Sequence, residues 1–143
     1  MAIPKEGKSK NGKAMHYSVG ALIEEDGKYL LIDRVKPPFG FAGVAGHIDE
    51  GEEAEEALVR EVKEESGLKV KGFKLLFEEE ANFNTCRRGI EVHYWYLFKC
   101  IVKGRVKQNI EETKSIDWYT IEEIKKLELE PVWKYYFEKM GII

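Results

Sequence analysis

Three glutamates near the middle of the chain, Glu61, Glu64 and Glu65, have a spacing that suits metal binding. They stand at positions i, i+3 and i+4, so their carboxylates share one side of a helix. A helical projection puts Glu61 and Glu65 in the same arc as the apolar residues Ala54 and Leu58. Carboxylates this close repel one another and should raise at least one pKa, unless a divalent cation is bound. Such hard oxygen ligands favour Mg²⁺ or Mn²⁺.

Acidic residues are concentrated around these glutamates. Residues 46–68 hold nine acids and two bases, a local net charge of −7, and the other 120 residues of the 143-residue chain carry +4. An acidic block is usually a solvated face, but here the helical phase argues for a site. The net charge of the whole chain is only −3, so we expect no binding to nucleic acid or to a membrane surface.

The element that must position the glutamates is a helix, predicted over residues 52–66. Acids in its first turn suit the helix dipole, and Gly67 provides the expected end. Residues 35–52, just before and into it, read "VKPPFGFAGVAGHIDEGE", which predicts a glycine-rich loop. Such a loop lets the backbone approach a ligand closely, or simply makes tight turns.

Strands and further helices should surround this loop and helix. Asp26-Gly27 separates the apolar runs 19–23 and 29–32, which predicts a β-hairpin. Thr120 and Glu123 form a capping box for one later helix, and Pro131 opens another. Further strands are predicted over residues 68–80, 89–102 and 115–120, and helices over residues 121–129 and 131–140. This mixture predicts a single α/β or α+β sandwich.

The two ends of the domain and its cellular location follow from composition. Residues 1–14 are rich in Lys, Gly and Ser and predict a flexible N-terminal arm, although a short strand within it is left open. Residues 15–143 are expected to form one domain. The start lacks the apolar core of a secretory signal, no apolar run has the length of a membrane span, and Cys86 and Cys100 are expected to be reduced thiols. We therefore expect a cytoplasmic protein.

One segment resembles a known family signature. Residues 46–68, "GHIDEGEEAEEALVREVKEESGL", resemble the signature box of the Nudix hydrolases. Gly46 is followed after five residues by Glu52 and after seven more by Arg60, and the remaining fixed positions of the box are all matched up to Leu68. The resemblance implies an α/β/α sandwich with a central mixed β-sheet.

The resemblance also implies roles for individual residues. Glu61, Glu64 and Glu65 would ligate Mg²⁺ or Mn²⁺, with the backbone carbonyl of Ala45 as a further ligand. The catalytic group would include Glu52, which pairs with Arg60 to hold the loop onto the helix. Many relatives have Pro-Gly where this chain has Val44-Ala45, but a main-chain carbonyl does not need those side chains.

Members of the family hydrolyse a nucleoside diphosphate linked to another group, X, to a nucleoside monophosphate and phosphorylated X. A general base would assist the attacking water. It could be Glu61 or Glu64 of the box, or a loop residue nearer the C-terminus, Glu111 or Glu112. For the loop pair, a solvated position is the more common alternative.

Four residues are candidates for binding substrate. Arg87 and Arg88 on a predicted loop, and Arg34 at the end of a strand, could meet phosphates. Phe41 could stack on a base, with core packing as its alternative. The run "HYWY", residues 93–96, alternates as a strand whose two faces could pack in the core or contact a base.

The identity of the substrate is left open. From residue 69 to residue 92 the chain lacks the proline and the tyrosine that mark relatives acting on ADP-ribose and on dinucleoside polyphosphates. Their absence favours nucleoside triphosphates, or oxidised forms of these, as the substrate. The alternatives are an ADP-ribose or nucleotide-sugar pyrophosphatase, a non-catalytic nucleotide-binding module, and an acidic helix without metal. The protein could be a monomer or a homodimer.

Overall fold

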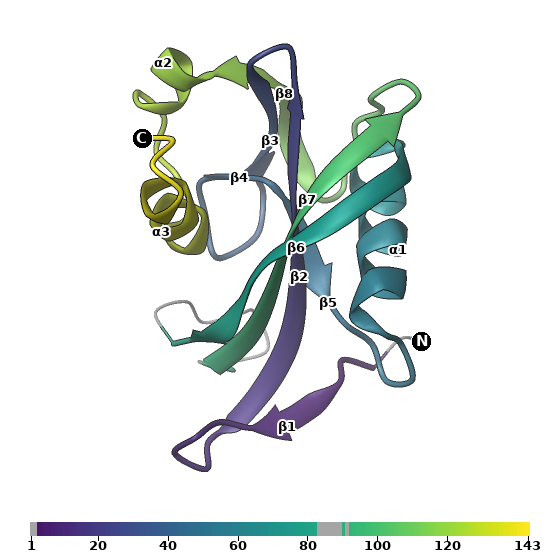
Figure 1. Ribbon diagram of the computed structural model, residues 1–143, viewed down its shortest axis with the longest axis vertical. Coiled ribbons are helices and arrows are strands. Elements are labelled where there is room, and N and C mark those ends of the chain that lie inside the picture. Colours follow the sequence, from purple (N-terminus) through teal and green to yellow (C-terminus); the bar gives the residue numbers. More distant parts are fainter. Residues whose placement is uncertain (1–2, 83–89, 91) are drawn as a thin grey trace.

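The computed structural model describes residues 3–82, 90 and 92–143. It consists of a mixed β-sheet with helices on both sides (Figure 1). The helix α1 (Ala54–Ser66) covers one face, and α2 (Ile121–Ile124) and α3 (Pro131–Lys139) lie on the other. The predicted α/β/α sandwich is therefore confirmed.

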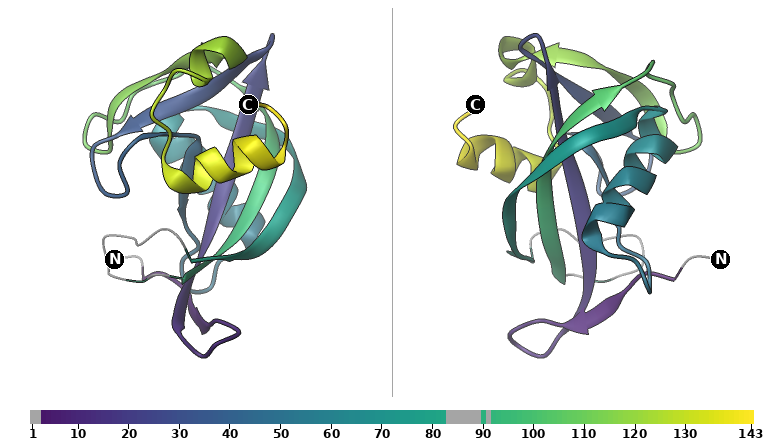
Figure 2. Two further views of the ribbon diagram at one scale, coloured as in Figure 1. Left: turned by 90° about the vertical axis from the view of Figure 1, so that its left-hand side faces the viewer. Right: turned by 45° about the vertical axis from the view of Figure 1, so that its right-hand side comes forward.

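The sheet has eight strands in the order β4-β3-β2-β7-β6, with β1 and β5 pairing with β2, and β8 pairing with β3. The strands β2 and β7 run parallel, and the other pairs are antiparallel. Figure 2 shows β2 running through the molecule from β1 to the hairpin with β3. The strands are β1 (Glu6–Lys8), β2 (Ala14–Glu25), β3 (Lys28–Arg34), β4 (Phe41–Ala42), β5 (Val44–His47), β6 (Lys69–Ala81), β7 (Val92–Lys103) and β8 (Thr113–Thr120).

Turn residues place the β2–β3 hairpin where the sequence predicts it. Asp26 and Gly27 have φ angles of 52° and 77°. Positive φ at both central positions is what a tight two-residue hairpin turn with the right twist requires, and Asp-Gly tolerates it. The hairpin prediction is confirmed.

Two short strands, β4 and β5, lie within the segment predicted to be a glycine-rich loop, so that prediction was wrong for residues 41–42 and 44–47. The strand β5 pairs with β2, with Gly46 opposite Val19. Gly43, between the two strands, lies so close to the ring of Trp133 that a Cβ atom there would overlap it. The strand β4 forms by pairing with β3, and β5 by pairing with β2, while the residue between them packs under a distant helix. None of these contacts leaves an alternating pattern in the local sequence.

The helices begin and end close to their predicted positions, with one exception. Glu53 and Glu56 form a capping box, so α1 starts at Ala54, two residues later than predicted. The predicted helix over residues 121–129 was too long, because α2 ends at Ile124. Beyond it, the backbone of residues 128–130 bonds to Phe41: the Phe41 amide donates to the Glu128 carbonyl at 2.9 Å. This pairing holds the segment extended.

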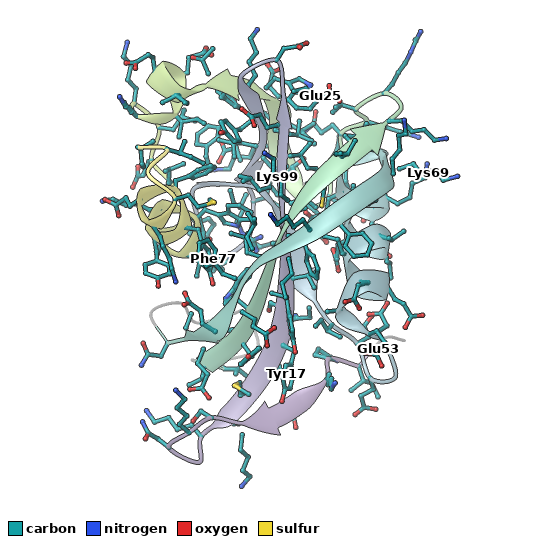
Figure 3. The ribbon with its side chains drawn as sticks, in the orientation of Figure 1. Tyr17, Glu25, Glu53, Lys69, Phe77 and Lys99 are labelled. Atoms are coloured by element: carbon teal, nitrogen blue, oxygen red, sulfur yellow. The ribbon has the colours of Figure 1, made fainter. Side chains whose placement is uncertain are left out.

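Apolar side chains fill both spaces between the sheet and its helices (Figure 3). Leu58 and Val62 of α1 are buried on one side, and Trp133, Tyr136 and Phe137 of α3 on the other. Each fully buried side chain of this size stabilises the fold by roughly 1.5–3 kcal/mol.

Cys100 is a free, buried thiol on β7. Burial raises the pKa of this thiol to about 12, which makes it a poor nucleophile at neutral pH. Cys86 lies outside the described residues.

The N-terminal residues are paired with the domain. The strand β1, which the sequence left open, pairs with β2. The Lys5 amide donates to the Ile48 carbonyl, and the Glu50 amide to the Ile3 carbonyl, both at 2.8 Å. The division into a flexible arm over residues 1–14 and a domain over residues 15–143 stays a prediction. Within residues 3–82, 90 and 92–143, no helix has both the length and the apolar composition of a membrane span.

Candidate active site

A cavity of about 330 Å³ lies beside α1 and β5. It gathers residues from the first strands, the loop before α1, α1 itself and the C-terminal third of the chain. Its lining consists of Pro4, Ser18, Arg34, Lys36, Pro37, Pro38, Ala45, Gly46, His47, Asp49, Arg60, Glu61, Glu64, Glu65, His93, Trp95, Asn109, Glu112, Glu130 and Trp133.

All three glutamates of the predicted metal helix line this cavity. Glu65 is the most buried of them, with 8% of its surface exposed, and one of its oxygens accepts a hydrogen bond from the Ala45 amide at 3.2 Å. The side chain of Glu61 is 13% exposed and that of Glu64 is 55% exposed. The structure thus brings the expected ligand set, including Ala45, to one wall of one cavity.

The buried glutamates have perturbed acidity. Burial raises the pKa of Glu61 to about 7, although the positive charge of Arg60 opposes this change. Burial also raises the pKa of Glu65 well above its usual range, and the negative charge of Glu61 adds to the effect. Burial and the repulsion between Glu61 and Glu65 both disfavour ionised carboxylates, and the charge of a divalent cation would compensate for both effects. The donor set is therefore suited to a hard cation such as Mg²⁺ or Mn²⁺.

Arg60 connects the loop before α1 to the metal helix. Its Nε and Nη2 atoms donate to the two oxygens of Glu52 at 2.8 and 2.9 Å. Nη2 also donates to the His47 carbonyl at 2.9 Å, and Nη1 donates to Glu61 at 2.7 Å and to Glu64 at 3.3 Å. Hydrogen bonding to Arg60 lowers the pKa of Glu52. This bidentate ion pair between Arg60 and Glu52 fixes the loop, and the same guanidinium contacts two of the expected metal ligands.

Positive charge and a further carboxylate come from outside the box. Arg34 lines the cavity, and its Nε atom donates to the Pro38 carbonyl at 2.8 Å. Lys36 also lines it and donates from Nζ to Glu112 at 3.1 Å. Glu112 therefore reaches the same cavity as the metal helix, whereas Glu111 is exposed and does not contribute to the described lining.

Comparison with known proteins identifies the family. The NUDIX domain model matches residues 14–139, which is most of the chain. The chain is a Nudix hydrolase. It therefore belongs to enzymes that hydrolyse phosphorus-containing anhydrides.

Two curated relatives and one solved structure illustrate the similarity. The chain is 32% identical over 112 residues to an ADP-ribose pyrophosphatase of Methanocaldococcus jannaschii; the match covers 77% of this chain and 64% of that protein's length. It is 31% identical over 132 residues to the nucleoside triphosphatase NudI of Enterobacter sp. (strain 638), with 85% and 94% covered. A MutT NUDIX hydrolase from Burkholderia pseudomallei has the same fold, with a TM-score of 0.76, 22% identity, and 87% and 96% covered.

One substrate candidate of this Nudix hydrolase, Phe41, is not among the described residues that line the cavity. Phe41 packs against Tyr119, with 5.8 Å between ring centroids. It is one of the partly buried apolar residues that surround the core between the sheet and α3. Phe41 is not among the described lining residues, so packing in the core, rather than stacking on a base, describes its position better. Arg87 and Arg88 lie outside the described residues, and their role stays a prediction.

Several lining residues have no counterpart among the candidates from sequence. Trp95 and Trp133 form part of the wall, and the Nε1 atom of Trp95 is buried without a hydrogen-bond partner among the described residues. Asn109 donates to the Glu64 carbonyl at 3.4 Å. Glu130 is buried, caps α3 by accepting from the Val132 amide, and has a pKa raised by its burial. Of these four residues, only Trp95 could have been found from the sequence, because the alternation of the strand places it on the same face as His93.

Proposed function

We propose that this Nudix hydrolase is a metal-dependent pyrophosphohydrolase that cleaves a nucleoside triphosphate, or an oxidised form of one, to a nucleoside monophosphate and pyrophosphate. The observation that carries the proposal is the convergence of Glu61, Glu64 and Glu65 on a cavity whose wall also holds Arg34 and Lys36. Carboxylates can hold the cations that a polyphosphate needs, and the two basic side chains can contact its oxygens.

Glu61, Glu64, Glu65 and the carbonyl of Ala45 would hold Mg²⁺ or Mn²⁺. When bound, such cations lower the pKa of a water molecule and neutralise charge on the phosphates. Support for a cation comes from the burial of Glu61 and Glu65, which raises both pKa values when no cation compensates. Nudix enzymes generally use divalent metals.

The side chains of the protein would orient the reaction. Arg60 donates directly to Glu61 and Glu64, and its ion pair with Glu52 fixes the guanidinium itself. Oxygen from water forms a new bond to phosphorus, the bond from phosphorus to the bridging oxygen breaks, and pyrophosphate leaves with that oxygen.

A carboxylate must accept the proton from water. Glu112, held beside Lys36 at the cavity wall, is our first candidate. Glu64, the most exposed of the three box glutamates at the cavity, is the alternative.

The choice of a triphosphate rests on the NudI relative, a nucleoside triphosphatase that the match covers over 94% of its length. ADP-ribose is the second candidate substrate, because the Methanocaldococcus jannaschii relative is an ADP-ribose pyrophosphatase. That match covers only 64% of the relative. We expect a cytoplasmic monomer or homodimer.

A product assay over a substrate panel tests the proposal. The panel contains the common and oxidised nucleoside triphosphates, ADP-ribose, nucleotide sugars and dinucleoside polyphosphates, each with Mg²⁺ or Mn²⁺. We expect nucleoside monophosphate and pyrophosphate from at least one triphosphate, with Glu64→Gln reducing turnover by at least about 100-fold. Glu55→Gln is the matched control, because Glu55 is an exposed glutamate on the same helix.

Other outcomes would favour a different function or contradict the metal site. Cleavage of ADP-ribose alone, to AMP and ribose 5-phosphate, would favour the second candidate. Tight nucleotide binding without products in saturating metal would favour a non-catalytic module. If neither Mg²⁺ nor Mn²⁺ raised the melting temperature, the metal site itself would be wrong, because a ligand of the folded state must stabilise it.

A further inference from the structure

All three histidines of the chain come together at one place. His16 is on β2, His47 on β5 and His93 on β7. His16 pairs directly with His93, while His47 pairs with Ser18, two residues along β2 from His16. Paired residues share a face of a sheet, as do residues two apart on one strand. The three imidazoles therefore point to the same side, and the three strands lie side by side (Figure 1).

The imidazoles are close enough to share one ligand. One nitrogen from each ring lies within 4.8 Å of the corresponding nitrogens of the other two. The ring centroids of His16 and His47 are 5.0 Å apart, and those of His47 and His93 are 5.7 Å apart. Ligands of a tetrahedral metal at about 2.0–2.1 Å are roughly 3.4 Å apart. Rotation of the side chains about their χ angles would bring the nitrogens closer to that separation.

His16 has the environment of a metal ligand. It is only 3% exposed, and its Nδ1 atom is buried without a hydrogen-bond partner among the described residues. A buried polar atom left in this way costs free energy, and binding a metal would satisfy it. Its other nitrogen, Nε2, lies 3.5 Å from a carboxylate oxygen of Glu6. A carboxylate beside the second nitrogen is the usual way to orient a metal-binding histidine.

The triad adjoins the active-site cavity but differs from the box glutamates in chemistry. His47 and His93 line that cavity, and the carbonyl of His47 accepts from Arg60. The box glutamates offer oxygen ligands, which suit Mg²⁺ and Mn²⁺, whereas imidazole nitrogens suit Zn²⁺ and related transition metals. Three protein ligands would leave a fourth tetrahedral position open.

We infer that His16, His47 and His93 form a second metal site, selective for a transition metal of the Zn²⁺ class and distinct from the carboxylate site. Glu6 is its positioning residue. Because His47 and His93 line the cavity, the occupied site would place a positive charge at the cavity wall.

Metal binding to the untagged, metal-stripped full chain tests this site without any activity assay. The chain is dialysed against ZnCl₂ in a large excess of MgCl₂, and bound zinc is measured by elemental analysis. We expect one zinc per chain. Co²⁺ as a probe should give the intense visible absorption of tetrahedral coordination, and Zn²⁺ should raise the melting temperature further in saturating Mg²⁺.

Variants separate the two metal sites. We expect His16→Asn to weaken zinc binding by more than about 100-fold and Glu6→Gln to weaken it by about 10- to 100-fold. Glu64→Gln should leave the zinc of the triad in place. His47→Asn is the second ligand variant, because His47 is only partly buried and its replacement disturbs folding least.

Two results would overturn the inference. One is the absence of zinc, in excess Mg²⁺, from a chain whose melting temperature shows that it is folded. The other is a bound zinc that survives both histidine substitutions and disappears in Glu64→Gln, which would assign it to the carboxylate site.

Discussion

The carboxylate of Glu61 occupies the space beside Gly46 that a side chain would need. A Cβ atom at Gly46 would overlap this carboxylate. The glycine that opens the box is thus required by contact with the metal helix fifteen residues later, and its φ angle is not in the left-handed region.

Substitution of Gly46 should therefore impair catalysis more than folding. In Gly46→Ala the methyl group displaces the Glu61 carboxylate, and misplacing a catalytic group by about 1 Å can cost about 100-fold in rate. We expect kcat to fall by at least that factor, measured with the best substrate of the panel. Gly72→Ala is the matched control, because a Cβ there meets nothing within 4 Å. Equal activity of the two variants would contradict the importance of this contact.

Glu52 should act by positioning Arg60. In Glu52→Gln the two charged hydrogen bonds to Arg60 are weakened, and we expect kcat to fall by about 10- to 100-fold with a smaller change in KM. The free energy of unfolding should fall by about 1–3 kcal/mol. Steady-state kinetics and denaturant titration measure the two effects. Glu55→Gln should change neither, and a loss of the same size in that control would show a general effect of charge on the helix.

The stability of the metal-free protein should depend on pH. The pKa of Glu61 rises from 4.5 to about 7 in the folded protein, and that of Glu65 also rises. A raised folded-state pKa means that the folded protein binds the proton more tightly. The stabilisation of the folded state by this tighter proton binding is complete below about pH 4.5, and it is lost as pH rises through 7.

Thermal melts in EDTA between pH 5 and pH 8 measure this loss. We expect the melting temperature to fall across that window, and saturating Mg²⁺ to reduce the fall because the cation binds the ionised carboxylates. Glu130, whose pKa is also raised by burial, contributes to the same trend. The comparison with Glu61→Gln isolates the glutamate, and an unchanged slope in that variant would refute the assignment.

Glu112 and Glu111 offer a direct test of the general base. Glu112 contacts Lys36 at the cavity wall, whereas Glu111 is exposed. If Glu112 accepts the proton from water, Glu112→Gln should lower kcat by about 10²- to 10⁴-fold. Glu111→Gln should behave like the native protein. A kcat of Glu112→Gln equal to that of Glu111→Gln would instead point to Glu64.

The part of the site that lies on one helix could be predicted from the sequence. The spacing of Glu61, Glu64 and Glu65 fixes their common side, because the period of a helix is a local property. The Asp26-Gly27 turn and the capping box at Thr120 were predictable for the same reason: turns and caps depend on a few neighbouring residues. The order of these elements, together with the box, was sufficient to predict the sandwich.

Tertiary structure decided what surrounds that helix. The strands β4 and β5 exist because β2 pairs with β5 and β3 with β4, and Phe41 turns into the core while Lys36 and Glu112 meet at the cavity. The histidine triad joins positions 16, 47 and 93, which no local pattern relates. Strand register and packing bring such residues together, and both depend on the whole chain rather than on the spacing of neighbours.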